Sequence, residues 1–510
     1  MRRFLFFVIL GCVFMVTQKA HAAAPSLVQY HDCMDEIDGG AGTASGRSGE
    51  YVVCRFPQPT LGGTGDCIVG GFMNDASSAV YTPTDDASNS YTVKSYEDTA
   101  NTEALALFYS INDTSANYVT LTNSASDPLR IPWIAEFTNC GGLDVASEGN
   151  HGTSTTATAG SATPAVTGDL VIDEMDADYQ SPKTVTMTPT VGSQTNITWA
   201  LLAASRAALG AVQWGVYTST SALNPSMTYS VAGAGNTNGF VSIAIFLKPA
   251  SSGPGIPAGP WIYGMKDSWI TNDGSGSTAF YTSPRTDNFP CPSTATMGYV
   301  GWIGATEGSD TLTAATLNGT SLTQTGAAYN GAADSISHNY YGVGLMMTTN
   351  QTLVLTGNFV SPSTIEYCVG GLSTFAQTET GSGSQSSTTG TLTATPAPLL
   401  TTTGASGLIF TQTGVSLNTV YGALSSTGLT CYAHTGLDSG ENANIQGINQ
   451  NNGWGVCKFS SSSTSVTPVW MQYKSSTASN AFVDRADEFD ASAVLKPATP
   501  KNLSGSVVPQ

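Results

Sequence analysis

Hydrophobic residues in this chain occur in short runs separated by Gly, Asn, Ser and Thr. Clear examples are 67–73, 104–111 and 297–305, where aliphatic and aromatic residues mix with Gly, Ala or Ser. Runs bounded by turn-forming residues are typical of β-strands, and many of them at fairly regular spacing predict antiparallel sheets packed as a sandwich. Helical periodicity is scarce, because only 199–209 shows it, and that segment also fits a buried strand running into a turn. We therefore expect an all-β protein.

The runs recur in the same order along the two halves of the chain. The first half closes with 242–250 and the second with 490–498, and both closing runs end in Lys-Pro-Ala, where proline terminates ladder pairing. The other matched pairs, first half before second, are 67–73 with 297–305, 104–111 with 342–348, 134–140 with 364–368, and 168–172 with 407–410. This repeated order predicts two related antiparallel β-sandwich domains in tandem.

The domain boundaries follow from a change in composition. The stretch 251–257, Ser-Ser-Gly-Pro-Gly-Ile-Pro, is typical of a linker. We expect a first domain with an N-terminal extension over 23–250, called the first half below. A second domain over 258–498 is called the second half. Residues 499–510 form a C-terminal tail.

The first 22 residues have the pattern of a secretory signal peptide. Arg2 and Arg3 precede an apolar run from Phe4 to Val16, and small residues at Ala20 and Ala22 suit cleavage before Ala23. The apolar run is shorter than the roughly 20 residues that a membrane-spanning helix needs. A lipid anchor is the alternative, since residues 9–12 loosely match a lipobox, although the apolar run continues past the cysteine. We expect a secreted, extracellular or cell-surface protein, with the periplasm as the other destination.

The charge balance excludes one class of partner. The chain has a net charge of −19, and removing the signal peptide makes the rest more negative. Binding to nucleic acid or to an anionic membrane depends on Lys and Arg. We therefore expect no nucleic-acid partner, and no further segment is long and apolar enough to span a membrane.

An even number of cysteines follows the signal peptide and predicts disulfide bonds in an exported chain. The eight are Cys33, Cys54, Cys67, Cys140, Cys291, Cys368, Cys431 and Cys457. Four precede the linker and four follow it, which leaves three pairings in each half if the halves are self-contained. No C-x-x-C spacing indicates a zinc ribbon or haem attachment.

Each half resembles the jelly-roll-type, concanavalin-like β-sandwich repeats of exported bacterial surface proteins. The residues that carry this resemblance are the turn 86–91, Glu136-Phe137, 168–171 and Lys248-Pro249 in the first half, with Glu366-Tyr367, Gly407-Leu408 and Lys496-Pro497 in the second. The second half lacks the Asp of 168–171, and its turn is reduced to 317–322. The resemblance implies a pair of disulfide-stabilised jelly-roll-like sandwiches. It implies almost nothing about activity, because such folds host many functions.

The sequence contains no catalytic motif with a specific pattern. Nucleophile elbows, H-E-x-x-H helices and phosphate-binding glycine loops are absent from it. Glu136 and Glu366 occupy matching positions and could face one concave sheet, as a glycoside hydrolase would require, or could equally point to solvent. Activity as an enzyme is therefore uncertain, and we expect a protein without a catalytic site.

Three acidic stretches, 32–38, 173–178 and 484–490, could supply carboxylate ligands to a structural calcium ion. None has the glycine-centred pattern of an EF-hand, and a solvated acidic loop is the simpler interpretation. We expect no other cofactor and no metal site.

The best local candidate for binding is a polar loop with a tryptophan. Residues 449–455 read Asn-Gln-Asn-Asn-Gly-Trp-Gly. Sugar rings stack on aromatic faces, and amide side chains donate to and accept from hydroxyls. Asn451, Asn452 and Trp454 are thus the predicted ligand-binding residues. The alternative is that Trp454 packs into the core, as we expect for Trp133, Trp199 and Trp302.

Three functions remain open. The first is a binding or adhesion protein whose partner is an extracellular polysaccharide or a surface protein. The second is a structural subunit of an extracellular layer, appendage or matrix, which would self-associate through an exposed edge strand. The third is a polysaccharide-degrading enzyme.

Overall fold

A computed structural model describes most of the chain after residue 22. The described residues are 23–35, 51–74, 81–98, 103–123, 130–177, 186–204, 210–232, 239–269, 283–289, 291–292, 294–305, 310–326, 329–330, 335–345, 351–359, 363–372, 376–381, 393–396, 400–401, 406–414, 420–425, 428–434, 452–460, 465–466, 468–474 and 483–491. The expected signal peptide and C-terminal tail lie outside them.

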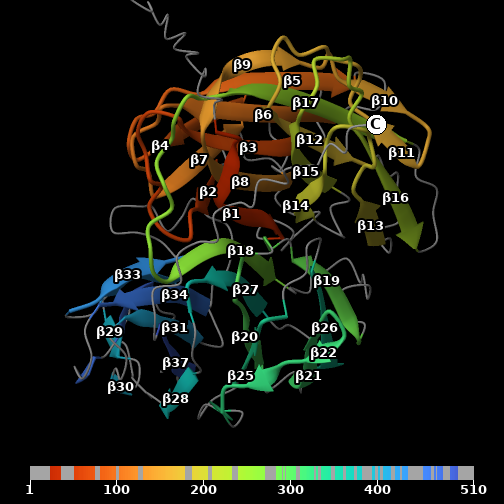
Figure 1. Cartoon of the computed structure of the whole chain (residues 1–510). Coiled ribbons are helices and arrows are strands. Elements are labelled where there is room, and N and C mark those ends of the chain that lie inside the picture. The colour runs from red at the N-terminus through yellow and green to blue at the C-terminus, as the bar shows by residue number, and fades with distance from the viewer. Residues whose placement is uncertain are drawn as a thin grey trace, which may run out of the picture.

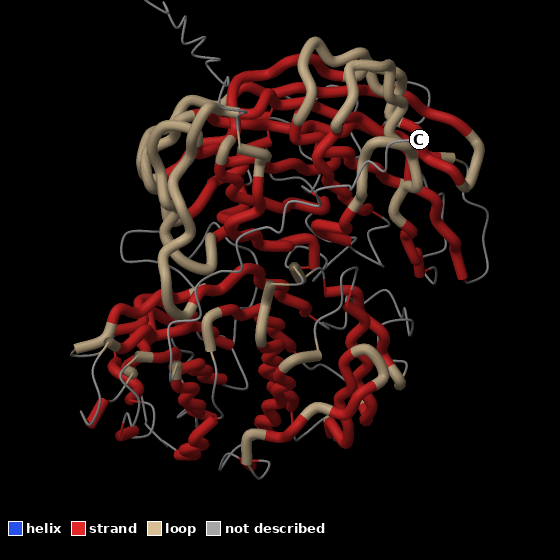
Figure 2. The backbone as a smooth tube through the Cα atoms, in the orientation of Figure 1, coloured by secondary structure: helices blue, strands red, loops and turns tan. Residues whose placement is uncertain are grey.

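Every regular element in these residues is a strand, so the expectation of an all-β protein is confirmed (Figure 2). The first half contains β1 (Ser26–Asp35), β2 (Tyr51–Arg55), β3 (Asp66–Asn74), β4 (Tyr81–Asp85), β5 (Thr92–Asp98), β6 (Glu103–Ile111), β7 (Tyr118–Asn123), β8 (Arg130–Thr138), β9 (Cys140–Ala146), β10 (Asn150–Gly152), β11 (Thr156–Thr158), β12 (Asp169–Asp176), β13 (Thr186–Thr190), β14 (Ala200–Ala204), β15 (Gly210–Tyr217), β16 (Ser226–Ala232) and β17 (Phe240–Pro249).

The second half contains β18 (Trp261–Trp269), β19 (Arg285–Phe289), β20 (Met297–Ala305), β21 (Thr311–Leu317), β22 (Thr320–Ser321), β23 (Thr323–Gln324), β24 (Tyr329–Asn330), β25 (Ser335–Val343), β26 (Gln351–Asn358), β27 (Ser363–Gly370), β28 (Ala376–Gly381), β29 (Thr393–Pro396), β30 (Leu400–Thr401), β31 (Gly407–Gly414), β32 (Val420–Ser425), β33 (Thr430–Ala433), β34 (Asn452–Phe459), β35 (Ser465–Val466), β36 (Val469–Lys474) and β37 (Val483–Asp490). The ambiguous segment 199–209 forms strand β14 where it is described.

One sheet of eleven strands runs through both halves (Figure 1). Its order is β23-β25-β20-β27-β18-β1-β8-β3-β6-β5, and β24 pairs with β25. The first strand of each half meets at the centre, where β1 and β18 pair in parallel. Tyr30 lies opposite Gly264 there, and a Cβ on Gly264 would come within 2.1 Å of the Tyr30 ring. The glycine thus allows an aromatic side chain of one half to lie directly over a strand of the other.

The prediction of two jelly-roll sandwich domains is wrong, although all-β structure and disulfides are confirmed. The sheets are arranged like the blades of a five-bladed β-propeller. The physical reason lies in the backbone: β1 and β18 satisfy each other's hydrogen-bonding groups, so neither half closes as a separate sandwich. The predicted linker 251–257 packs against the first half, where Thr138 Oγ1 donates to Pro254 O at 2.6 Å.

The smaller sheets follow matching orders in the two halves. In the first half they run β10-β17-β12-β15-β14, β11-β16-β13 and β2-β7-β4; in the second they run β28-β37-β31-β34-β33, β29-β36-β32 and β19-β26-β21-β22. In the first set β9 also pairs with β17, and β30 pairs with β35 in the second half. Most sequence landmarks fall on corresponding strands, but the closing strand of the second half, β37, ends at Asp490. Residues 492–498, including Lys496-Pro497, lie outside the described part.

Buried contacts join the two halves into one body. A single apolar cluster includes Tyr30 and Phe137 of the first half with Trp261 and Phe289 of the second. His434 belongs to the second half, and its Nε2–H donates to the Pro57 carbonyl at 2.7 Å. Burial lowers the His434 pKa to about 3, so the imidazole stays neutral and keeps this donor. The junction therefore combines backbone pairing, apolar packing and directed hydrogen bonds.

Candidate functional site

The predicted tryptophan loop does not provide an open binding surface. Asn452 and Trp454 belong to β34, and Trp454 is 2% exposed in an apolar cluster with Tyr299 and Phe410. Asn451 lies outside the described residues. A buried indole has no face available to a sugar ring, so the structure agrees with the alternative that Trp454 is a core residue. Trp133, Trp199 and Trp302 are buried as expected.

The two glutamates proposed as a catalytic pair lie far apart. Glu136 is on β8 and Glu366 on β27, and β1 and β18 separate these strands in the eleven-stranded sheet. Three steps between neighbouring strands amount to about 14 Å. Glycoside hydrolases place their two carboxyl groups within roughly 10 Å. Both glutamates are also buried. The sheet order does not support a shared catalytic pair.

Glu136 instead shares a proton with a neighbouring carboxyl group. Its Oε2 accepts from Gln29 Nε2 at 2.6 Å, and Oε1 accepts from the Leu61 N–H. Burial raises the Glu136 pKa well above its usual value, and the hydrogen bond with Asp66 raises it further. Burial also raises the pKa of Asp66 to about 6, and that of nearby Asp113 to about 8. This cluster holds protons inside the fold, because all three carboxyl groups are buried.

The acidic stretches lie in strands where the structure describes them, not in solvated loops. Residues 173–176 belong to β12, which is buried along its whole length. Asp173 accepts from Gln213 Nε2 at 2.7 Å and from Ser242 Oγ at 3.0 Å, and Trp133 Nε1 donates to Glu174 at 3.2 Å. Residues 484–490 belong to β37. Calcium ligation by an exposed acidic loop therefore has no counterpart at these positions.

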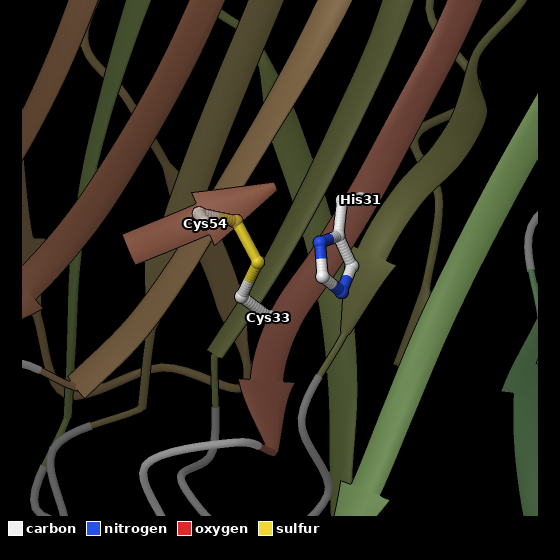
Figure 3. Close-up of side chains that lie close together, drawn as sticks. All are labelled: His31, Cys33 and Cys54. Atoms are coloured by element: carbon white, nitrogen blue, oxygen red, sulfur yellow. A yellow bond between two sulfur atoms is a disulfide. The ribbon is translucent and has the colours of Figure 1, made fainter. Parts of the chain in front are cut away.

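One group in the described residues brings together three side chains of metal-binding types, one histidine and two cysteines (Figure 3). Donor atoms of His31, Cys33 and Cys54 lie within 4.8 Å of one another, and all three residues are buried. However, Cys33 and Cys54 form a disulfide, so neither sulfur is a thiolate. The His31 Nδ1–H donates to the Arg55 carbonyl at 2.6 Å. This group does not fit a metal ion while the disulfide is intact.

All eight cysteines after residue 22 are paired. The disulfides are Cys33–Cys54, Cys67–Cys140, Cys291–Cys368 and Cys431–Cys457. Each bond stays within one half, as the equal division of cysteines about residues 251–257 suggested. Several disulfides in one chain are typical of extracellular proteins.

An exposed pair of rings lies on the first half, on two strands of different sheets. The Tyr96 hydroxyl on β5 and Nδ1 of His151 on β10 are 2.7 Å apart, and both side chains reach solvent. The ring centroids are 6.4 Å apart with an interplanar angle of 21°. Because the hydroxyl joins the two rings end to end, they form one nearly coplanar surface, called the Tyr96–His151 platform below. No sequence pattern pointed to it, since its two residues are 55 positions apart.

The backbone of Gly149 packs closely against the Tyr96 ring of this platform. Gly149 has a φ of 81°, and a Cβ there would lie 2.2 Å from the Tyr96 ring. Glycine is thus required both by the backbone angle and by the close approach. Exposed Glu148 precedes Gly149 outside the two strands, whereas Glu97 on β5 and Asn150 on β10 alternate with the two ring residues and so point to the opposite faces of their strands.

Comparison with known proteins identifies no relative. No protein-family model matches the sequence, and no curated protein or solved structure is similar to it at a significant level. In the described residues, no helix is long and apolar enough to cross a membrane.

Proposed function

We propose that the chain is an exported binding or adhesion protein that contacts polysaccharide through the Tyr96–His151 platform. The observation that carries this proposal is the nearly coplanar, solvent-facing arrangement of the two rings. Four disulfides and a strongly acidic composition suit a protein that works outside the cell.

The geometry favours an extended sugar polymer over a small ligand. The C–H face of a pyranose packs on an aromatic face, and two rings in one plane can contact neighbouring sugars of the same chain. The Tyr96 hydroxyl and His151 hold each other through a hydrogen bond, which reduces the entropy lost on binding.

Depletion from solution by a panel of insoluble polysaccharides tests the proposal. The oxidised protein, residues 23–510, should be removed by at least one polymer. Tyr96→Ala and His151→Ala should each weaken that binding about tenfold, or about 1.4 kcal/mol. Tyr118→Ala is a matched control, since Tyr118 is a partly exposed tyrosine of the same half that lies against Arg55. No depletion by any polymer would remove the glycan-binding part of the proposal.

A structural subunit is the second candidate, favoured by the position of β5. Among the described strands β5 ends the eleven-stranded sheet, so its outer edge offers backbone groups for pairing with another chain. Such a subunit would show concentration-dependent assembly in sedimentation experiments. A binding protein would remain monomeric and still deplete. Release of reducing sugars during the same assay would point to the third candidate, a polysaccharide-degrading enzyme.

The proposal extends to the origin of the chain as two fused copies of one exported repeat. The matching strand orders of the two halves support this, as do the short sequence landmarks that fall on corresponding strands. In this view the pairing of β1 with β18 fused two ancestral units into one sheet.

A further inference from the structure

A lysine with no solvent exposure lies at the junction of the two halves. Lys266 on β18 is 0% exposed, and its Nζ is 2.9 Å from Asp287 Oδ1 and 3.6 Å from Asp32 Oδ2. Asp32 is on β1, directly opposite Lys266 in the parallel pair, and Asp287 is on β19 in the four-stranded sheet. The lysine therefore reaches from one sheet to another, with a carboxylate from each side. Figure 1 shows the three strands, β1, β18 and β19, that carry these residues.

The surroundings hold the amine in one place. Nζ donates to the Ala204 carbonyl at 2.8 Å, and the Ala204 N–H donates to Asp32 Oδ2 at 3.0 Å. The same residue of β14 thus positions both the amine and the carboxylate of Asp32. A fixed amine next to a fixed carboxyl group has a very high effective concentration, of order 10⁵ M or more in well-oriented systems.

The carboxyl group of Asp287 also accepts hydrogen bonds from two further donors. Asp287 Oδ2 accepts from the Arg285 guanidinium at 2.8 Å, and Oδ1 accepts from the Asn288 N–H at 2.9 Å. These two donors would stabilise negative charge on oxygen if a nucleophile added to Asp287 Cγ. Asp32 Oδ2 lies 3.6 Å from Nζ, so an approach of about 0.5 Å brings it within reach of a proton on the amine.

We propose that Lys266 and Asp287 become joined by an intramolecular amide bond. Asp32 removes one proton from the Lys266 ammonium, and the free amine adds to Asp287 Cγ, forming the C–N bond. The tetrahedral intermediate places its charge on oxygen, where Arg285 and the Asn288 N–H stabilise it. Its collapse breaks one C–O bond. That oxygen leaves as water with the proton held by Asp32 and a second proton from nitrogen, while the third proton remains on the amide.

The reaction needs no oxidant and no second substrate, because an ammonium and a carboxylate give an amide and water. Burial favours this exchange. Two opposite charges held away from water carry a desolvation cost of several kcal/mol per ion, whereas an amide is neutral. The product links β18 of the eleven-stranded sheet directly to β19 of the four-stranded sheet, and so adds a second covalent connection beside the Cys291–Cys368 disulfide.

Mass spectrometry of the purified, folded protein tests the proposal directly. The intact mass should be lower than that calculated for the sequence with four disulfides by the mass of one water. After reduction, chymotrypsin should release fragment 264–269 attached to fragment 282–299 as a branched peptide, with fragmentation placing the link at Lys266 and Asp287. A full, unmodified mass would overturn the proposal, and so would a link from Lys266 to Asp32.

Three variants separate the roles of the groups. Asp287→Asn should form the same amide with loss of ammonia, so its final mass should equal that of the linked wild type. Asp32→Asn keeps both reacting groups but lacks the base, so most of the protein should remain unlinked. Asp287→Ala should show no link. If Asp287→Ala fails to fold, Asp287→Asn still decides the matter, because an unlinked folded Asn variant contradicts the mechanism.

Discussion

The two halves carry a glutamate at corresponding places in the shared sheet but surround it differently. In the first half Glu136 lies opposite Gln29 of β1. In the second half Glu366 lies opposite Lys266 of β18. One half therefore places a neutral amide beside its glutamate, whereas the other places an ammonium group there.

The consequences extend beyond the two side chains. Gln29 donates to Glu136 at 2.6 Å and accepts from the Gln58 N–H at 3.2 Å, so its hydrogen bonds stay within the first half. Lys266 contacts Asp32 of the first half and Asp287 of another sheet. A buried charge needs partners of opposite charge, wherever the fold can supply them. A single amide-to-ammonium difference thus converts a local contact into a connection between sheets.

The largest effect should come from removing the ammonium. We expect Lys266→Met to lower the free energy of unfolding by about 3–5 kcal/mol, because Asp32 and Asp287 are then buried carboxylates with neither an ammonium nor an amide bond to offset their burial. Guanidinium denaturation followed by tryptophan fluorescence measures the change. A loss below 1 kcal/mol would mean that Asp32 and Asp287 are not charged in the folded variant, or that Arg285 alone balances them.

The matched substitution in the first half, Gln29→Leu, should lower the free energy of unfolding by less. Gln29→Leu removes a partner from Glu136 and from the Gln58 N–H, and leaving such buried groups unsatisfied costs about 1–3 kcal/mol. No charge is stranded, since burial and the contact with Asp66 already favour protonated Glu136. The comparison fails if Gln29→Leu destabilises the protein as much as Lys266→Met in the same denaturation experiment.

The sequence predicted the strands better than their assembly. Short apolar runs identified β3, β8, β12 and β20. Burial of a strand selects apolar residues within one short stretch of sequence, so this signal is local. The pairing of β1 with β18 joins residues more than 230 positions apart through backbone atoms. Backbone hydrogen bonds leave no mark in side-chain pattern, so the single sheet across both halves could not be predicted from it.

The candidate sites were less predictable for a related reason. Asp173 and Asp487 appeared to be solvated because charge usually indicates exposure, but distant partners such as Gln213 and Tyr299 satisfy them inside the fold. The Tyr96–His151 platform likewise depends on the approach of two strands from different sheets. The disulfides were the exception, since eight cysteines, divided equally about residues 251–257, restrict the possible pairings strongly.

The next largest effect is the change of the free energy of unfolding with pH. We expect it to come from buried carboxyl groups of the first half. Burial, with nearby Asp66, raises the Asp113 pKa to about 8, and burial raises the pKa values of Asp169 and Asp173 to about 7. The ordinary value is 3.8, so the folded state binds more protons than the unfolded state and stability falls as pH rises toward 8. In the second half, Lys266 and Arg485 accompany the buried Asp287 and Asp487.

Asp113→Asn tests this dependence between pH 6.5 and 8. Burial lowers the pKa of His338 to about 4 and that of His434 to about 3, so within this window only the unfolded chain releases protons from these two histidines, and this contribution is the same in the wild type and the variant. The variant should lose less stability with rising pH, by about 1 kcal/mol per pH unit at most. Urea denaturation at four pH values measures the slope. An unchanged slope would show that Asp113 is ionised in the folded protein.

A second row across the sheet also differs between the halves. Ile134, Gly70 and Phe108 are neighbours on three strands of the first half, and the Phe108 ring fills the space beside Gly70. In the second half, His338 and Trp302 occupy neighbouring strands with ring centroids 5.2 Å apart. Within the described part of the chain, neither nitrogen of His338 has a hydrogen-bond partner. The second half therefore holds a polar ring where the first holds an apolar one.

The smallest effect should come from making this row apolar. We expect His338→Phe to change the free energy of unfolding by less than about 1 kcal/mol at pH 7.5, in the stabilising direction, because it removes buried polar atoms that gain nothing from the fold. At pH 5 its advantage should grow. The folded pKa of His338 is about 4 against 6.5 when unfolded, so the wild type loses stability as pH falls through this range and the variant does not. Equal denaturation midpoints for the two proteins at both pH values would mean that the His338 ring has a partner that offsets its burial.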